Sequence, residues 1–442
     1  MFFWSAYCSE RKWGVFRPKS PLFRSAGTDA VHFLFGLLSF FAAVFYFWRT
    51  FPVQKYAEVA RRYAAPAEDS AFYRSEYVAP REGAVTFPAR KKNLIVILME
   101  SMESSFADRG SGGLMERNLI PGLTRLADEN VSFSGTDRLG GGIDLAGTGW
   151  TIAAMTAKFA GLPFNLLGKA NQRRLMFLPN AVTLTDILSQ NGYRQLMMFG
   201  SDKRFAGRDT LLETHGNVEI HDVAWYKESG MLEKDYSVFW GFEDKKLFGF
   251  ARTELDDLGR DGGPFMLGIL TVDTHMPSGY RCDVCPETED MQLKNAVRCA
   301  DAQVSAFIGW CAGQPWYKDT VIAVMGDHRF MANETTNPFG DSRYLAPGAE
   351  NPRRWLDIFV NAEPAGTFSA ADAKNRLFSS LDMFPTILAA MGCSIDGNRL
   401  GFGVNLFSGE RTLCEKYGED YLNAELMRRN RQYAALERPG KG

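Results

Sequence analysis

Five continuous apolar runs recur along the sequence, and segments with helical character separate them. The runs are NLIVILME (93–100), RQLMMFG (194–200), PFMLGILTVD (264–273), DTVIAVMGD (319–327) and RRWLDIFVN (353–361). Strands that are apolar on both faces are typical of a parallel sheet covered by helices on each side. Helices are expected over 117–129, 151–160, 181–191, 294–312 and 380–391. The alternation predicts an α/β fold with a mostly parallel central sheet and helices on both faces.

A different apolar run, VHFLFGLLSFFAAVFYFW (31–48), carries no Asp, Glu, Lys or Arg. A run of this length is enough for a helix to cross the ~30 Å hydrocarbon core of a bilayer. The preceding residues are basic overall, which places the N-terminus in the cytoplasm and the remainder outside. A cleaved signal peptide is the rival interpretation, but no small-residue cleavage site follows the run. A buried core helix would not be apolar on every face.

The predicted organisation of the chain follows from these two features. A basic cytoplasmic segment (1–30), a transmembrane helix (31–49) and a charged juxtamembrane linker (50–91) precede one large domain (92–408) and a C-terminal tail (409–442). The formal net charge of −2 gives no argument for a nucleic-acid partner. The predicted localisation is the cell membrane, single-pass, with the large domain on the extracytoplasmic side.

Three predicted strands end in residue types that bind metal ions. Glu100, His275 (after Asp273 and Thr274) and the pair Asp327-His328 follow three different runs. In open α/β sheets, ligands bind at the carboxyl ends of the strands. Two carboxylates and one imidazole suit Mn²⁺, Zn²⁺ or Mg²⁺. Taken singly, each residue has a structural interpretation as an ion-pair partner, a turn residue or a solvated loop histidine; the combination favours a metal site.

The stretch GGGIDLAGTGWTIAAM (140–155) is rich in glycine, which is costly unless the backbone must approach something closely. Thr148 lies among these glycines just before a predicted helix, whose N-terminal amides favour an anion. A threonine hydroxyl becomes a usable nucleophile next to a divalent metal. We therefore predict Thr148 as both nucleophile and metal ligand, and Thr151, one helical turn further on, as the second candidate.

The seven cysteines are too few for a disulfide-dense scaffold. Cys282 and Cys285 form a CxxC pair, but Cys299 and Cys311 follow with the spacing C-x₁₁-C on a predicted helix, which does not suit a zinc finger. A disulfide within 282–311 is expected, with its pairing left open. Cys393 is expected to be a buried apolar residue.

The order of these motifs resembles the alkaline phosphatase/sulfatase superfamily, and within it the lipoteichoic acid synthase and phosphoglycerol transferase branch. The matching stretches span about 92–408 and include LIVILMESMESSF (94–106), GTGWTIAAMTAKFAGLP (147–163), FGSDKRFAGRD (199–209), TVDTHMPSGY (271–280) and VMGDHRF (324–330). The resemblance implies that Glu100, Thr148, Asp327 and His328 hold one divalent ion, Mn²⁺ or Mg²⁺ rather than Zn²⁺. It also places the nucleophile at Thr148, fifteen residues before Pro163.

Further roles come from the same resemblance. Arg208 would contact the glycerophosphate head group, and His275 would contact the substrate phosphate or assist proton transfer. Ala206 stands where the family has a tryptophan, which leaves that wall of the pocket in question. The C/S-x-P-x-R frame of formylglycine sulfatases is missing from the sequence, so sulfate-ester hydrolysis by that route is disfavoured.

The predicted function is therefore metal-dependent transfer of glycerophosphate from phosphatidylglycerol, a membrane phospholipid donor, to a glycan or polymer acceptor through a phospho-threonine intermediate. A phosphodiesterase or phosphatase-type hydrolase and a phosphoethanolamine transferase of the same superfamily are the alternatives. A non-enzymatic lipid- or glycan-binding protein is a third, disfavoured by the presence of Glu100, Thr148, Asp327 and His328 together.

Overall fold

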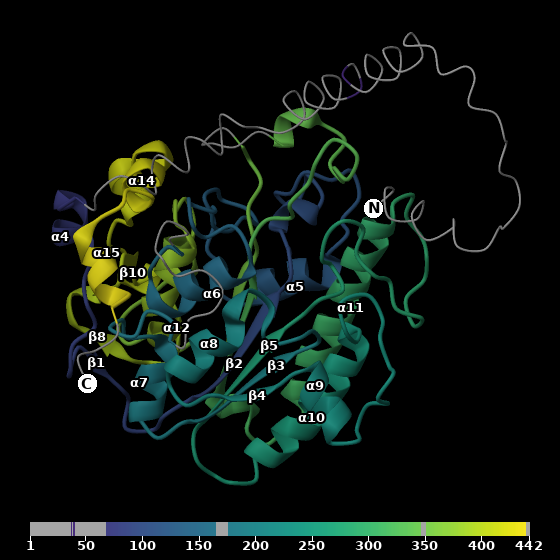
Figure 1. Ribbon diagram of the computed structural model, residues 1–442, viewed down its shortest axis with the longest axis horizontal. Helices are drawn as coiled ribbons and strands as arrows, with labels where there is room; N and C mark the ends of the chain where they lie inside the picture. The colour runs from purple at the N-terminus through teal and green to yellow at the C-terminus, as the bar shows by residue number, and fades with distance from the viewer. Residues whose placement is uncertain (1–36, 38, 40–67, 165–175, 346–350, 439–442) are drawn as a thin grey trace, which may run out of the picture. The chain divides into compact units, whose positions relative to one another are not determined.

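A six-stranded sheet forms the centre of the computed structural model, which describes residues 37, 39, 68–164, 176–345 and 351–438 (Figure 1). The strand order is β4–β3–β5–β2–β6–β7. Neighbouring strands run parallel except β7, which is antiparallel to β6 at one edge. The mostly parallel sheet predicted from the sequence is confirmed, with one antiparallel edge. The strands are β2 (Asn93–Met99), β3 (Arg194–Phe199), β4 (Glu219–His221), β5 (Phe265–Leu270), β6 (Thr320–Gly326) and β7 (Asp357–Val360).

Helices cover both faces of this sheet, as β2 shows. Its residues Leu94, Val96 and Leu98 belong to one apolar cluster, and Ile95, Ile97 and Met99 belong to another, because successive side chains of a strand point to opposite faces. The first cluster includes α6 (Thr151–Ala160), α7 (Leu184–Gln190), α8 (Arg208–Thr214) and α12 (Met383–Ala390). The second includes α5 (Pro121–Glu129), α10 (Asp244–Leu258) and α11 (Gln292–Ala312). Figure 1 shows the two groups on either side of the strands.

The five predicted strands and five predicted helices are all present, with ends that shift by a few residues. The sequence did not predict the short strand β4 or the helices between β3 and β5, namely α8, α9 (Val223–Glu228) and α10.

The segments expected as linker and tail contribute to a third apolar cluster. Phe72, on α4 (Ala71–Glu76), shares this cluster with Leu413, Leu422 and Tyr433. Those three residues belong to α13 (Leu413–Tyr417), α14 (Glu419–Leu426) and α15 (Arg431–Leu436). The folded unit therefore includes residues on both sides of 92–408.

The predicted transmembrane helix (31–49) and the basic segment before it lie outside the described residues, except for positions 37 and 39. In the described part of the chain, no helix has the length and apolar character needed to cross a bilayer.

Candidate active site

Strands β2 and β6 bring Glu100, Asp327 and His328 together. The two strands are parallel neighbours and Met99 pairs with Gly326, so Glu100 and Asp327 follow the sheet at the same level. One ligand atom from each of the three side chains lies within 4.8 Å of the other two. All three are buried, at 3, 0 and 0 % exposure. The three protein side chains predicted to bind the metal, apart from the threonine, therefore meet in one cluster.

Hydrogen bonds from Ser101 hold the two carboxylates in place. Its backbone N–H donates to Asp327 Oδ1 at 2.7 Å, and its hydroxyl donates to Glu100 Oε1 at 2.7 Å. Ser101 adopts a φ of +52°, which is unusual for a residue with a Cβ and reverses the chain directly after β2. The backbone N–H of His328 donates to the same Asp327 oxygen at 2.8 Å. Sequence reasoning missed Ser101, because a left-handed φ at a serine leaves no signal in the sequence.

The ligand atoms of Asp327 and His328 that these hydrogen bonds leave unused suit a divalent cation. Asp327 Oδ2 and His328 Nε2 are buried without a hydrogen-bond partner among the described residues, and they lie 3.4 Å apart. His328 Nδ1 donates to the carbonyl of Arg329 at 2.8 Å, which leaves the Nε2 lone pair free to bind a metal. Burial and the charge of Glu100 raise the pKa of Asp327 to about 7. A bound cation would relieve both the missing partners and the crowding of negative charge.

The two candidate threonines have different surroundings. The Thr148 side chain is fully buried, and its Oγ accepts from Leu145 N at 2.9 Å and donates to Leu145 O at 3.0 Å. Thr151 is the first residue of α6, and its Oγ donates to Glu100 Oε2 at 3.4 Å. The structure thus gives the contact with the metal-site carboxylate to Thr151, and gives Thr148 a local turn contact.

Arg208 begins α8, next to the carboxyl end of β3, and is 4 % exposed. Its guanidinium donates to Ser201 Oγ at 3.0 Å and to the carbonyl of Asp202, whereas its Nε has no partner within the described residues. Burial lowers the pKa of Arg208 to about 10, and the charge of Glu100 opposes that shift. A buried guanidinium with a spare donor is suited to binding an anionic oxygen.

His275 follows β5 and is half-buried. Its Nδ1 lies 2.9 Å from the carbonyl oxygen of Met276, so Nδ1 carries the proton and Nε2 has no hydrogen-bond partner among the described residues. The imidazole packs against the ring of Trp240, with centroids 4.5 Å apart. Trp240 was not singled out by the sequence analysis.

A buried lysine is a further site residue that sequence reasoning missed. Lys158 lies on α6 and is fully buried, and its ammonium donates to the carbonyl of Asp327 at 3.0 Å and to Ser380 Oγ at 2.9 Å. The ammonium also lies 3.9 Å from the ring centroid of Trp355. Burial lowers the pKa of Lys158 to about 8, although nearby carboxylates oppose the shift. The available signal was a single charged residue in the helix TIAAMTAKFA, whose other residues are apolar apart from two threonines.

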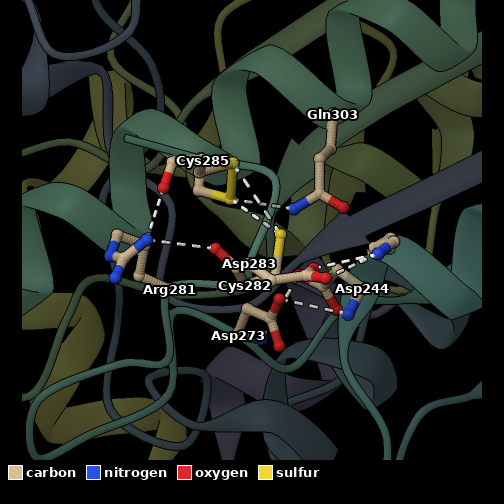
Figure 2. The surroundings of a disulfide bond; sticks show 9 residues. Asp244, Asp273, Arg281, Cys282, Asp283, Cys285 and Gln303 are labelled. Atoms are coloured by element: carbon tan, nitrogen blue, oxygen red, sulfur yellow. Dashed lines mark hydrogen bonds and ion pairs between the residues drawn. A yellow bond between two sulfur atoms is a disulfide. The ribbon is translucent and has the colours of Figure 1, made fainter. Parts of the chain in front are cut away.

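The expected disulfide in the 282–311 region is confirmed and joins Cys285 to Cys299. Figure 2 shows the sulfur of Cys282 directed toward this bond, and it lies 3.4 Å from Cys299 Sγ. Cys311 and Cys393 are buried free thiols, which for Cys393 is the predicted role.

Comparison with known proteins identifies the family. The sequence profile of the sulfatase family matches residues 92–393. The chain belongs to the sulfatase family. This sulfatase-family chain is 31% identical over 338 residues to phosphoglycerol transferase I of Salmonella choleraesuis, an alignment that covers 75% of the chain and 41% of that relative. The chain thus spans less than half the length of the curated relative. The similarity confirms the phosphoglycerol transferase branch of the superfamily that the motifs indicated.

Solved structures show the same fold for this sulfatase-family chain. The lipoteichoic acid synthase LtaP from Listeria monocytogenes aligns with a TM-score of 0.54 at 17% identity, covering 79% of this chain and 81% of that one. An alkaline phosphatase superfamily protein from Vibrio parahaemolyticus aligns with a TM-score of 0.52 at 20% identity, covering 81% and 79%. At these identities the likeness establishes the architecture.

Proposed function

We propose that the protein is a metal-dependent phosphoglycerol transferase that moves glycerophosphate from phosphatidylglycerol to a glycan or polymer acceptor. The observation that carries the proposal is the position of Thr151. Its hydroxyl lies at the N-terminus of the buried helix α6 and donates to Glu100, within a cluster of unpartnered metal-ligand atoms. The similarity to phosphoglycerol transferase I supports the choice of donor.

Glu100, Asp327 and His328 would hold one divalent ion together with the threonine oxygen. When bound, such an ion lowers the pKa of a coordinated hydroxyl and neutralises charge on the phosphoryl group. Mn²⁺ and Mg²⁺ are favoured because oxygen ligands outnumber nitrogen in this set. The proposed location is the cell membrane, with a single N-terminal span and the site on the extracytoplasmic side.

The chain's own residues divide the work of the reaction. Thr151 passes its hydroxyl proton to Glu100 Oε2, its Oγ attacks phosphorus, and the bond between phosphorus and the diacylglycerol oxygen breaks. His275, in its imidazolium form, donates its Nε2 proton to that leaving oxygen, and Arg208 binds a phosphoryl oxygen through its unused Nε–H. An acceptor hydroxyl then attacks phosphorus and releases Thr151 Oγ, which takes its proton back from Glu100, while His275 takes up the acceptor's proton.

Trapping of the intermediate tests this proposal. The full-length protein is incubated with Mn²⁺ and phosphatidylglycerol labelled in its head group, and peptides are then analysed by mass spectrometry. A glycerophosphate adduct on Thr151, discharged by adding a glycan, is the expected result. Free glycerophosphate in every mixture would establish a hydrolase instead. A phosphoethanolamine adduct formed only from phosphatidylethanolamine would replace the proposed donor.

A further inference from the structure

Three large aromatic side chains are exposed beside the candidate substrate-binding residues. Phe205, Phe239 and Trp240 have 50, 39 and 43 % of their surface exposed. The ring centroids of Phe205 and Trp240 lie 5.7 Å apart, and those of Phe239 and Trp240 lie 6.4 Å apart. The three rings form one contiguous cluster, named here the aromatic rim.

The aromatic rim adjoins the site on two sides. Trp240 packs on His275 with ring centroids 4.5 Å apart. The guanidinium carbon of Arg208 lies 5.6 Å from the ring centroid of Phe205. A substrate held by Arg208 and His275 would therefore have the aromatic rim next to it.

Two strained turns present these rings. Val238 and Gly241 bond each other's backbone at 2.9 and 3.0 Å, which leaves Phe239 and Trp240 at the tip of a two-residue turn. The tip residue Phe239 has a φ of +53°, and Ala206, next to Phe205, has a φ of +58°. A left-handed conformation costs a residue with a Cβ about 1–2 kcal/mol. Backbone strain of this kind persists mainly at functional positions.

We propose that the aromatic rim is a membrane-docking surface whose rings enter the interfacial layer of a phospholipid bilayer. The inference rests on the proposed function, because it assigns the bilayer as the phase that supplies the lipid donor. Tryptophan and other aromatic side chains favour this interfacial layer. The rings of the rim meet at 62° and 84°, so they offer no shared flat face for stacking a sugar. Rings at such angles can instead insert among mobile lipid chains, which adapt to an uneven apolar surface.

The basic side chains that precede Phe205 are already paired with carboxylates. Arg204 pairs with Asp202 at 2.6 Å, and Lys203 pairs with Glu213 at 3.6 Å. Docking should therefore depend on apolar burial and only weakly on salt or on anionic lipid.

The length of the connecting chain is compatible with docking. Residues 49–67 lie between the apolar run that ends at 48 and the first residue of the folded unit that the structure describes. Extended, this connection spans at most about 65 Å. A run anchored in the bilayer would thus keep the folded unit near the bilayer surface.

Turnover in proteoliposomes tests the docking surface. The full chain is assayed with phosphatidylglycerol in the bilayer and, separately, with a water-soluble glycerophosphodiester of 4-nitrophenol. In Phe239→Asn, asparagine tolerates the left-handed backbone, so the turn survives while the ring is lost. We expect the ratio of bilayer to soluble turnover to fall roughly tenfold, the effect of one phenylalanine leaving an apolar phase. The matched control Tyr421→Asn removes an aromatic residue of 46 % exposure on α14, and its ratio should stay at the wild-type value.

A second readout reports contact with the bilayer independently of turnover. Brominated phosphatidylcholine in the proteoliposomes should quench the tryptophan fluorescence of the wild type more than that of Trp240→Phe. The chain has nine tryptophans, so the other eight contribute a background signal in both proteins. Equal quenching, or an unchanged turnover ratio in Phe239→Asn, would overturn the proposal. So would a raised KM for a glycan acceptor at an unchanged ratio, which would make the rim a sugar-binding surface. If the wild type turned over neither donor, the proposed function would fail while the quenching difference still tested docking.

Discussion

The hydroxyl of Thr151 contacts the carboxylate of Glu100, which supports its proposed role as nucleophile, whereas that of Thr148 hydrogen-bonds only to Leu145 among the described residues. The one donor of the Thr148 hydroxyl and one of its two lone pairs are used by Leu145. We expect Thr151→Ala to lower kcat by about 10³-fold or more, as removal of a covalent nucleophile does. Thr148→Ala should keep most of its activity and lose about 1 kcal/mol of unfolding free energy, because one hydrogen-bonded turn is weakened.

Steady-state kinetics with the soluble diester, together with urea unfolding of each variant, would measure both effects. Inactive Thr148→Ala protein of normal stability, beside active Thr151→Ala protein, would return the nucleophile to the position first predicted.

Asp357 gives a residue-scale prediction about pH. Its carboxyl is fully buried on β7, one oxygen accepts from Phe133 N at 2.8 Å, and the other has no partner among the described residues. Burial raises the pKa of Asp357 to about 8. The folded state therefore keeps a proton that the unfolded state releases above about pH 4, so this group's contribution to stability falls as pH rises between those values.

The variant Asp357→Asn should remove that dependence. Its unfolding free energy relative to wild type should rise between about pH 4 and pH 8, with a slope of at most about 1.4 kcal/mol per pH unit, and level off above. Denaturant titrations at several pH values measure the difference. A constant difference across this range would mean that Asp357 is ionised in the folded protein.

The clustering of the three candidate metal ligands could be predicted from the sequence, whereas the hydroxyl that contacts one of them could not. Glu100, Asp327 and His328 follow strand-like runs, and parallel strands deliver their ends to one edge of the sheet. The choice between Thr148 and Thr151 depends on the residue at which α6 begins. That residue is set by the turn at Gly147, whose φ is +82°, and by packing that no spacing rule encodes.

At the scale of elements, helix α6 contacts the candidate metal site at two points, through Thr151 and through Lys158. Lys158 lies seven residues after Thr151, about two helical turns, and so projects from nearly the same face. Its ammonium is a buried cation near the carboxyl groups of Asp144, Asp327 and Asp357. Asp144 also pairs with Arg329 at 2.9 Å, and Asp357 keeps its proton up to about pH 8, so the charge of Asp327 depends most on Lys158. We expect Lys158→Met to destabilise the metal-free protein by about 3 kcal/mol, because buried negative charge then lacks a partner.

Added Mn²⁺ should recover more stability in Lys158→Met than in wild type, since the ion would supply the missing positive charge. Thermal unfolding of both proteins with and without Mn²⁺ measures this. An equal Mn²⁺-induced shift in both would show that the lysine acts through packing alone.

The sheet core was readable from the sequence because its strands are long and apolar on both faces. Strand β4 was not predicted, because Glu219–His221 is three residues long and only its last residue is buried. The antiparallel direction of β7 could not be read either. Its run, buried on both faces, has the same composition as that of a parallel strand, and direction is fixed by the chain that connects it to β6.

For the whole molecule, the metal site predicts a link between ion binding and stability. Two of the three buried candidate ligand side chains, Asp327 and His328, have unpartnered atoms in the metal-free fold, and a bound ion would add stability that grows with its concentration. At a Mn²⁺ concentration of about 100 Kd, the added free energy of unfolding is about 2.7 kcal/mol. The unfolding temperature should rise by several degrees and fall again on chelation.

This stabilisation by Mn²⁺ should strengthen with pH. Without an ion, burial beside Glu100 holds the pKa of Asp327 at about 7, so ion binding must displace a proton below that pH. The affinity for Mn²⁺ should therefore increase from pH 6 to pH 8. Isothermal titration calorimetry measures this affinity, and repeating it in buffers of different ionisation enthalpy gives the number of protons released on binding. His328→Ala should lose the Mn²⁺-induced shift, and Tyr421→Asn should retain it. A shift of wild-type size in His328→Ala would place the ion elsewhere in the molecule, and the role of Thr151 as its activated hydroxyl would fall with it.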